Sequence, residues 1–456
     1  MGGGMQQPGS QQPTRMQMGS RFLEEGLRQE LQHRAYLTHA QIDPEDDSLA
    51  DVPPMVQQYH SIFPLESLEE SGPSASLGVR TVVIKGVSSV DGQAYALRRI
   101  DGRQVIPGPQ LAQAAMEAVD RWSKLAGNPY IVGLRSAFAS REWDDAQAMF
   151  FAYDYYPGAA TLEAVHLQQE ANKGVVHLSV TEDQLWSYTV QIASALRAIH
   201  SSGLAARPGG LAPSKVLLTG RGRLRLSACG LVDVLFGEPS DDLRLLQRED
   251  LSSLGGLLLT LACGSFGASM DFLAAHFSTG LARLVAGLVS AGEPGGIRDV
   301  HQLCGLLGER MFTELEHASL FSDVLTSELS KEMENGRLLR LLVKISAVAD
   351  RPDADMHQGW AETGDRYLVK LFRDFLFHQT GDDGTPSVDW GHVVEALNKL
   401  DAGVPERVLL LSRDESSMLV VSYRDIKRCI ESSFGELEQA GQQSGAGVGR
   451  GMPGGR

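Results

Sequence analysis

Two basic residues stand where the chain could hold a polyphosphate. Arg98 lies near the end of the β-rich segment 93–100, and Lys215 follows a proline and a serine just ahead of the apolar run 216–218. Guanidinium and ammonium groups bind phosphate oxygens through charge-assisted hydrogen bonds, and they can do so without magnesium. Two alternatives remain open at this point: Arg98 pairs with a structural carboxylate, and Lys215 is solvated.

The segments that carry these residues follow the order of the protein-kinase motifs. Kinases use a glycine-rich loop, a lysine in V-A-I-K, an aspartate in H-R-D and a magnesium-binding aspartate in D-F-G. Residues 95–98 read Y-A-L-R at the V-A-I-K position, and residues 211–218 read L-A-P-S-K-V-L-L where kinases have L-K-P-E-N-I-L-L. Residues 250–255, D-L-S-S-L-G, match the D-x-W-S-x-G start of a kinase helix, which is a structural anchor.

The catalytic side chains of these motifs are missing. The H-R-D positions hold residues 208–210, P-G-G, or residues 205–207, A-A-R, if the loop carries an insertion, and residues 228–230, A-C-G, replace D-F-G. Residues 78–83 have too few glycines for close backbone contact with phosphates. A bound metal and a positioned base supply most of the transition-state stabilisation. The sequence therefore predicts no catalytic residue, no metal site, and no acidic side chain in the cleft to hold a divalent cation.

Composition limits the partners of the chain. Its 456 residues include 41 basic and 57 acidic side chains, and the formal charge of −16 repels nucleic acid and anionic membranes at long range. The cysteines at 229, 263, 304 and 429 are too far apart in sequence for a zinc site, so we expect buried thiols in a reducing compartment. No signal peptide is visible, and the longest apolar run, 254–263, is too short for a bilayer. We expect a soluble, intracellular protein.

Strands precede helices in the first two thirds of the chain. The pattern predicts strands at 81–87, 93–100, 131–138 and 148–153, and the turn residues Asp91-Gly92 favour a two-residue hairpin between the first two. Helices are expected at 22–37, at 119–124 with the alanine-rich run before it, and at 182–201. A small sheet followed by a helical lobe predicts an α+β, two-lobed, kinase-like domain at 65–310. Residues 21–64 are an N-terminal extension with a short helix.

A long helix and a helical knob follow. Over 311–349, apolar residues occupy seven of eleven heptad a and d positions, which favours a dimerising coiled coil, although Gly336 should weaken or kink it. A helix packed on its own domain is the alternative. The knob, 350–456, has expected helices at 367–377, 388–400 and 423–434 and a strand-like run at 407–411. The ends, 1–20 and 439–456, are expected to be disordered.

An ordered set of segments resembles the regulatory pseudokinase subunit of the poly(A)-nuclease deadenylation complex, which shortens messenger RNA tails. The similarity runs from about Phe22 to Glu438. Its diagnostic stretches are 59–66 (Y-H-S-I-F-P-L-E), 91–100 (D-G-Q-A-Y-A-L-R-R-I), 151–157 (F-A-Y-D-Y-Y-P), 213–217 (P-S-K-V-L) and 365–377 (D-R-Y-L-V-K-L-F-R-D-F-L-F). The resemblance implies a cytoplasmic, non-catalytic subunit that forms a homodimer through the coiled coil 311–349. The coil and knob would hold the catalytic nuclease, and the subunit would help to bring poly(A) RNA to it.

The resemblance also implies an ATP site without phosphotransfer and without a metal. By position, its residues are Arg98, Asp154, Tyr155, Tyr156, Pro157, Gly158, Ala159, Ala160, Thr161, Ser214 and Lys215. Ahead of Arg21 there is no Cys-rich zinc finger and no evident motif for poly(A)-binding protein. The resemblance therefore does not extend to recruitment through those elements.

Other functions remain open from the residues alone. One is an active, unconventional kinase with metal-dependent phosphate transfer. Another is a stand-alone nucleotide-binding pseudokinase or RNA-binding adaptor without a nuclease partner, for which Arg221, Arg223 and Arg225 alternate along a strand and are expected to face solvent. Trp360 and Trp390 could line a pocket for a partner's aromatic side chain, or belong to the core.

Overall fold

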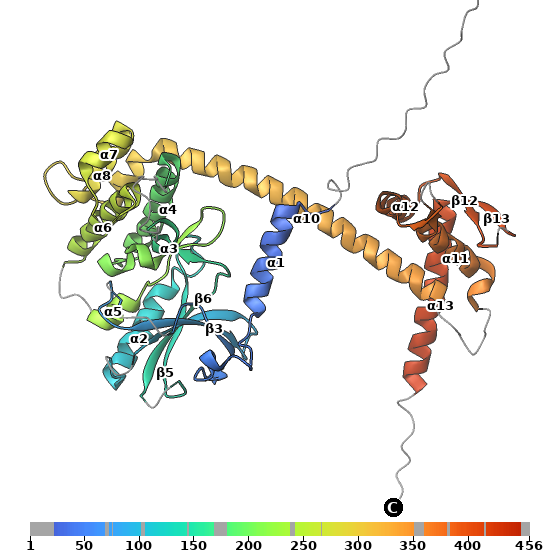
Figure 1. Ribbon diagram of the computed structural model, residues 1–456, viewed down its shortest axis with the longest axis horizontal. Helices are drawn as coiled ribbons and strands as arrows, with labels where there is room; N and C mark the ends of the chain where they lie inside the picture. Colours follow the sequence, from blue (N-terminus) through green and yellow to red (C-terminus); the bar gives the residue numbers. More distant parts are fainter. Residues whose placement is uncertain are drawn as a thin grey trace, which may run out of the picture. The chain divides into compact units, whose positions relative to one another are not determined.

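The computed structural model describes residues 22–447 except 69–72, 75, 102–104, 144–145, 168–179, 238–241, 266, 351–359, 381–383 and 415. The predictions for 1–20 and 448–456 lie outside the described residues. The chain divides into two compact units, residues 29–320 and residues 321–456 together with 1–28 (Figure 1). Among the helices of the described chain, none combines the length and apolar composition that a membrane span needs.

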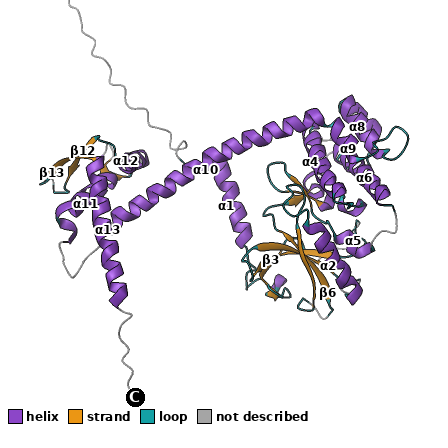
Figure 2. Cartoon of the chain, turned by 180° about the vertical axis from the view of Figure 1, so that it is seen from behind, coloured by secondary structure: helices purple, strands orange, loops and turns teal. Residues whose placement is uncertain are grey.

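An antiparallel sheet of six strands forms the first lobe of the unit 29–320 (Figure 2). Its order is β1-β2-β3-β4-β6-β5. The strands are β1 Met55–Val56, β2 Tyr59–Pro64, β3 Thr81–Ser88, β4 Ala94–Ile100, β5 Leu134–Ser140 and β6 Ala148–Asp154. All four predicted strands are present, although β5 begins only at Leu134. Strands β1 and β2 come from the segment that the sequence assigned to an N-terminal extension, and β2 pairs with β3.

The β3–β4 hairpin is confirmed, but its loop is longer than the expected two-residue turn. Strand β3 ends at Ser88 and β4 begins at Ala94, so residues 89–93 form the loop. Gly92 has a left-handed φ of +70° and donates its N–H to the Ser88 carbonyl at 2.9 Å. The Asp91 carboxylate accepts the amide two residues on at 2.9 Å, which stabilises the wider loop.

The second lobe of this unit is helical and packs around a leucine-rich core. Its principal helix, α4 Glu182–Ser201, has the predicted bounds because Thr181 and Gln184 form a capping box at its start. The predicted helix over the alanine-rich run is α2 Pro109–Ser123, which belongs with the first lobe because it packs on β5 of the sheet. The other elements are β7 Ala160–Thr161, α3 Leu162–His166, β8 Val216–Leu218, β9 Leu224–Leu226, α5 Leu231–Phe236, α6 Leu243–Cys263, α7 Met270–His276, α8 Thr279–Val289 and α9 Val300–Leu306.

Asp250, within α6, anchors the loop that corresponds to the catalytic loop of kinases. Its carboxylate is fully buried and accepts the amides of Ala206 and Arg207 at 2.8 and 2.6 Å. The same carboxylate lies 2.8 Å from the His200 Nε2 atom. Burial raises the pKa of Asp250, whereas these three hydrogen bonds favour its ionised form. The structural role that the D-L-S-S-L-G motif predicted for this aspartate is confirmed.

The helix predicted over 311–349 is confirmed as α10 Gly308–Asp350, which continues through Gly336 without a break. In the unit that contains the knob, this helix is followed by α11 Gly364–Phe377, β10 Gln379–Thr380, β11 Pro386–Ser387, α12 Trp390–Ala402, β12 Arg407–Leu411, β13 Met418–Ser422 and α13 Tyr423–Gly447. Trp360 is half-buried against the knob core, and Trp390 is 54% exposed. Trp390 is therefore not a core residue of this chain.

Helix α13 corrects the expectation that the chain is disordered from residue 439. The helix extends to Gly447 in spite of the glycines and glutamines in its last turns. Its first turns pack in the knob core through Tyr423, Ile426 and Ile430. Extension from an existing helix adds one hydrogen bond per residue and needs no new nucleation, which explains the additional turns.

Among the cysteines, Cys229 and Cys429 are buried as predicted, but Cys263 and Cys304 are only half-buried.

Replacing Asp250→Ala should destabilise the unit 29–320 strongly. The substitution leaves the amides of Ala206 and Arg207 and the ring of His200 without their acceptor, at a cost of about 3 kcal/mol or more. We expect the unfolding temperature to fall by roughly 6–10 °C in calorimetry. Asp183→Ala is the control, because its side chain is 95% exposed and its ion pair with Arg310 is long, at 3.9 Å. Equal unfolding temperatures for the two variants would show that Asp250 is not an anchor.

Candidate nucleotide site

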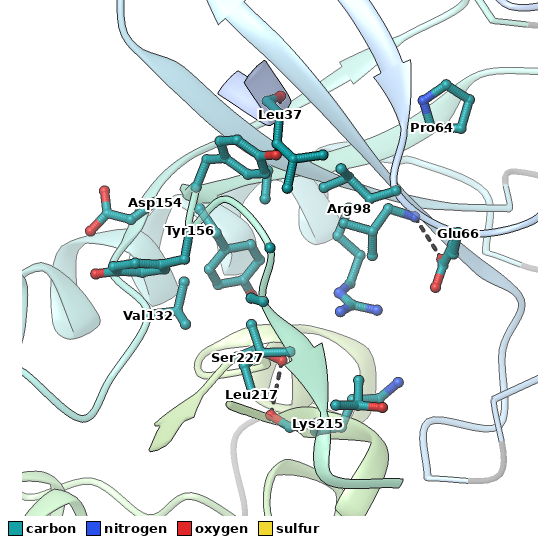
Figure 3. A pocket seen from close by; sticks show the side chains of 18 of the residues that line it. Leu37, Pro64, Glu66, Arg98, Val132, Asp154, Tyr156, Lys215, Leu217 and Ser227 are labelled. Carbon is teal, nitrogen blue, oxygen red and sulfur yellow. Dashed lines mark hydrogen bonds between the residues drawn. The ribbon is translucent and has the colours of Figure 1, made fainter. Parts of the chain in front are cut away.

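A cavity of about 350 Å³ lies between the sheet and the helical lobe of the unit 29–320. Strands β3 and β4 contribute one wall, the segment that follows β6 contributes the back, and the 3-10 helix η4 Pro213–Lys215 with β8 contributes the floor (Figure 3). The sequence-predicted residues that line it are Arg98, Asp154, Tyr155, Tyr156, Gly158, Ala159, Thr161, Ser214 and Lys215. Pro157 and Ala160 do not line it.

Arg98 reaches the cavity from β4 and carries no ion pair within the described chain. Its residue is only 8% exposed, and Nη1 donates to the Thr81 hydroxyl at 3.1 Å. The buried Nε atom has no hydrogen-bond partner. The alternative that Arg98 serves a structural carboxylate therefore does not hold for this structure. A buried guanidinium with a free donor is prepared to bind an anion.

Lys215 approaches the same space from the floor of the cavity (Figure 3). The residue is 6% exposed, so the alternative that it is solvated is wrong. Burial, and then the positive charge of Arg98, lower the pKa of Lys215 to about 8. The ammonium has no ion pair among the described residues. Two cations thus share a small, largely buried space, and each disfavours the charge of the other.

A carboxylate that the motif comparison did not assign, Glu66, also lines the cavity. Its Oε1 accepts the amide of Val83 at 2.7 Å (Figure 3), and its charge partly opposes the lowering of the Lys215 pKa. Glu66 is thus an acidic side chain in the cleft that the sequence prediction did not name. Glu66 is the last residue of segment 59–66, one of the stretches that resemble the family, and this position is the signal in the sequence that could have identified it. Within the described part of the chain, no group of three or more His, Cys, Asp and Glu side chains could hold a metal ion.

The hinge between the lobes is held by ion pairs and ring contacts. Asp154 accepts two hydrogen bonds from the Arg135 guanidinium, at 2.6 and 2.9 Å. Arg225 was expected to face solvent. Its guanidinium instead lies over the Tyr156 ring, 4.0 Å from the ring centre. Arg221 is exposed but pairs with Glu30 at 3.0 Å. These contacts occupy two of the three arginines that the RNA-binding alternative would use.

The residues at the D-F-G position start a helix. Gly230 has a φ of +81° and precedes α5, whose Asp233 accepts the indole N–H of Trp122 at 2.9 Å. Tyr153 donates its hydroxyl to the Cys229 carbonyl at 3.0 Å. Burial raises the pKa of the Cys229 thiol, so this side chain stays neutral. The position that holds magnesium in kinases is here a buried, uncharged packing site.

Comparisons with known proteins agree over most of the chain. The family described as the Pan3 C-terminal knob domain matches residues 300–437. The PAN2-PAN3 deadenylation complex subunit pan3 of Dictyostelium discoideum is 41% identical over 437 residues, a match that covers 93% of this chain and 56% of the relative. The chain thus spans about half the length of the curated relatives it matches.

Solved structures are similar along both units. A Neurospora crassa complex of PAN2 (WD40-CS1) with PAN3 (pseudokinase and C-term) contains a chain that is 32% identical, with a TM-score of 0.75. That match covers 91% of this chain and 100% of the solved one. The Drosophila melanogaster PAN3 pseudokinase is 36% identical, with a TM-score of 0.73, over 85% of this chain and 100% of its own. The predicted fold class, a two-lobed pseudokinase with a long helix and a mostly helical knob, is confirmed, and the chain belongs to the Pan3 pseudokinase family.

Proposed function

We propose that the chain is a non-catalytic regulatory subunit of a poly(A)-nuclease complex in the cytoplasm. It recruits and stimulates a catalytic subunit that shortens the poly(A) tails of messenger RNA. The observation that carries this proposal is the match over 91% of the chain to a PAN3 protein solved in a complex with PAN2. Catalysis falls to the partner, because an alanine stands where kinases have the D-F-G aspartate.

Exposed leucines on α10 support self-association. Leu315, Leu329 and Leu339 occupy heptad positions and are 61%, 70% and 61% exposed. A 43-residue helix with an exposed apolar seam at these positions gains most by packing against a second helix. We assign this seam to a homodimer. The coil and knob together then bind the catalytic subunit.

The cavity supports nucleotide binding without phosphate transfer. An adenine ring fits between the apolar side chains Val83, Ala96 and Leu217. Phosphate oxygens of ATP then meet Arg98 and Lys215, neither of which forms an ion pair with a described residue. These two cations supply the positive charge that magnesium supplies in kinases, so binding needs no metal. The formal charge of −16 on the chain repels RNA at long range. We therefore assign poly(A) binding to the complex rather than to this subunit alone.

Capture of the nuclease should depend on the C-terminal third of the chain. A tagged full-length chain is expected to retain a catalytic poly(A)-nuclease subunit from a lysate of its source organism, as identified by mass spectrometry. Deletion of residues 311–456 should abolish this capture. The variant Lys215→Met, which leaves coil and knob unchanged, is the control and should capture the nuclease normally. Retention of the nuclease by residues 1–310 would contradict the proposed arrangement.

Two exposed leucines of α10 distinguish a coiled-coil seam from a generally apolar helix. Leu329 lies at a heptad a position and Leu320 lies off the seam, and they are 70% and 64% exposed. We expect Leu329→Asp to convert the dimer to a monomer, because it buries an unpaired charge at the seam. Leu320→Asp should leave the dimer intact. Light scattering measures the mass of both variants, and a monomeric wild type or equal behaviour of the variants would exclude the seam.

Nucleotide affinity should fall as pH rises through the pKa of Lys215, about 8. A bound phosphate favours the charged ammonium, so binding is strongest below this pKa and weakens above it. In EDTA, the dissociation constant for ATP should rise about tenfold between pH 7 and pH 9 in calorimetric titrations. Lys215→Arg should bind equally at both values, because its guanidinium stays charged. A wild type that parallels Lys215→Arg, or that binds only with magnesium, would contradict the proposed site.

A further inference from the structure

Helix α1 Glu25–His39 supplies one side of the cavity from outside the kinase-like motifs. Leu37 lines the cavity, and a methyl group of its side chain lies 3.5 Å from the position that a Cβ atom would have on Gly158. The Tyr155 hydroxyl donates to the Leu37 carbonyl at 3.4 Å. Figure 3 shows Leu37 on the far side of the cavity from Lys215. The last turn of α1 therefore covers the hinge side of the space where a nucleotide would lie.

A buried lysine on β3 fastens this turn. Lys85 is fully buried, and its ammonium donates to the carbonyls of Thr38, at 2.9 Å, and Ala40. Carbonyls at a helix C-terminus lack partners within the helix and carry its partial negative charge, so an ammonium satisfies both needs. Within the described chain, Lys85 has no ion pair and no other hydrogen-bond acceptor. A buried ammonium is costly without acceptors, and both of its acceptors are present only while α1 is docked.

Little else holds this part of α1. From residue 29 to residue 39, no side chain of the helix is fully buried. Leu31 and Tyr36 are 46% and 71% exposed, and the Glu30–Arg221 pair lies at the surface, where ion pairs contribute little. A segment with so little apolar burial opens at low free-energy cost. Lys85 is therefore its principal attachment.

We propose that residues 34–40 are a strap that completes the nucleotide site, and that Lys85 is the residue that docks it. The inference rests on the proposed binding of nucleotide. A nucleotide in the cavity contacts Leu37 only when α1 is docked, so nucleotide and strap stabilise each other. Release of the nucleotide then requires the strap to open.

The test is the release rate of a fluorescent ATP analogue from the full-length chain, measured by displacement with excess ATP. Lys85→Met removes both hydrogen bonds to the strap and keeps an unbranched, apolar side chain at the buried position. We expect release to be faster by about tenfold or more. Tyr155→Phe, which removes one weak hydrogen bond, should accelerate release about two- to threefold. Lys124→Met removes an exposed charge elsewhere in the same unit and should release the analogue at the wild-type rate.

A second readout separates loss of the strap from loss of the fold. Nucleotide should protect the amides of residues 34–40 from hydrogen exchange in the wild type but not in Lys85→Met, while the amides of β3 and β4 stay protected in both. If Lys85→Met does not fold, Leu37→Ala removes the covering side chain alone and should also accelerate release. Unchanged release from these variants would overturn the strap and leave the nucleotide site standing. A wild type that binds no nucleotide would overturn both.

Discussion

The repulsion between Arg98 and Lys215 is the constraint on which the site depends. Each cation is at most 8% exposed, and the protein supplies neither with an ion pair among the described residues. Folding therefore brings two positive charges into one cavity; burial, and then the charge of Arg98, lower the pKa of Lys215. The polyphosphate that we propose as the ligand would relieve that repulsion. Where an active kinase has metal-binding carboxylates and a metal, this chain has two fixed cations.

Around this altered centre, the framework of a kinase is kept. Asp250 still organises the catalytic-loop backbone, and α4 still forms the centre of the helical lobe. At the D-F-G position, Gly230 precedes a helix that packs on α2 through Trp122. The structural anchors do not depend on the catalytic groups, so the fold persists without the chemistry.

The sequence predicted elements whose local signals agree with their packing. Helix α4 has a capping box and an apolar face, and α10 has heptads, so both were identified. Local composition gave the wrong prediction at the end of α13, where the helix continues into a glycine-rich segment because its earlier turns pack in the knob core. Glu66 and Leu37 were not assigned to the site because no motif marks them. Only the folded chain brings the end of β2 and the end of α1 to the cavity, and pairing with β3 makes β2 part of the sheet.

The proposed strap, residues 34–40, is a further example. No motif marks this segment, yet it covers one side of the cavity that the kinase-like motifs line. The two-cation site can be tested with a crystal structure of the chain with ATP, grown without divalent metal. Phosphate oxygens should lie within about 3.2 Å of both the Arg98 guanidinium and the Lys215 ammonium. Phosphates turned away from these side chains, or a site that fills only when a metal ion joins Glu66 to the phosphates, would contradict the two-cation site.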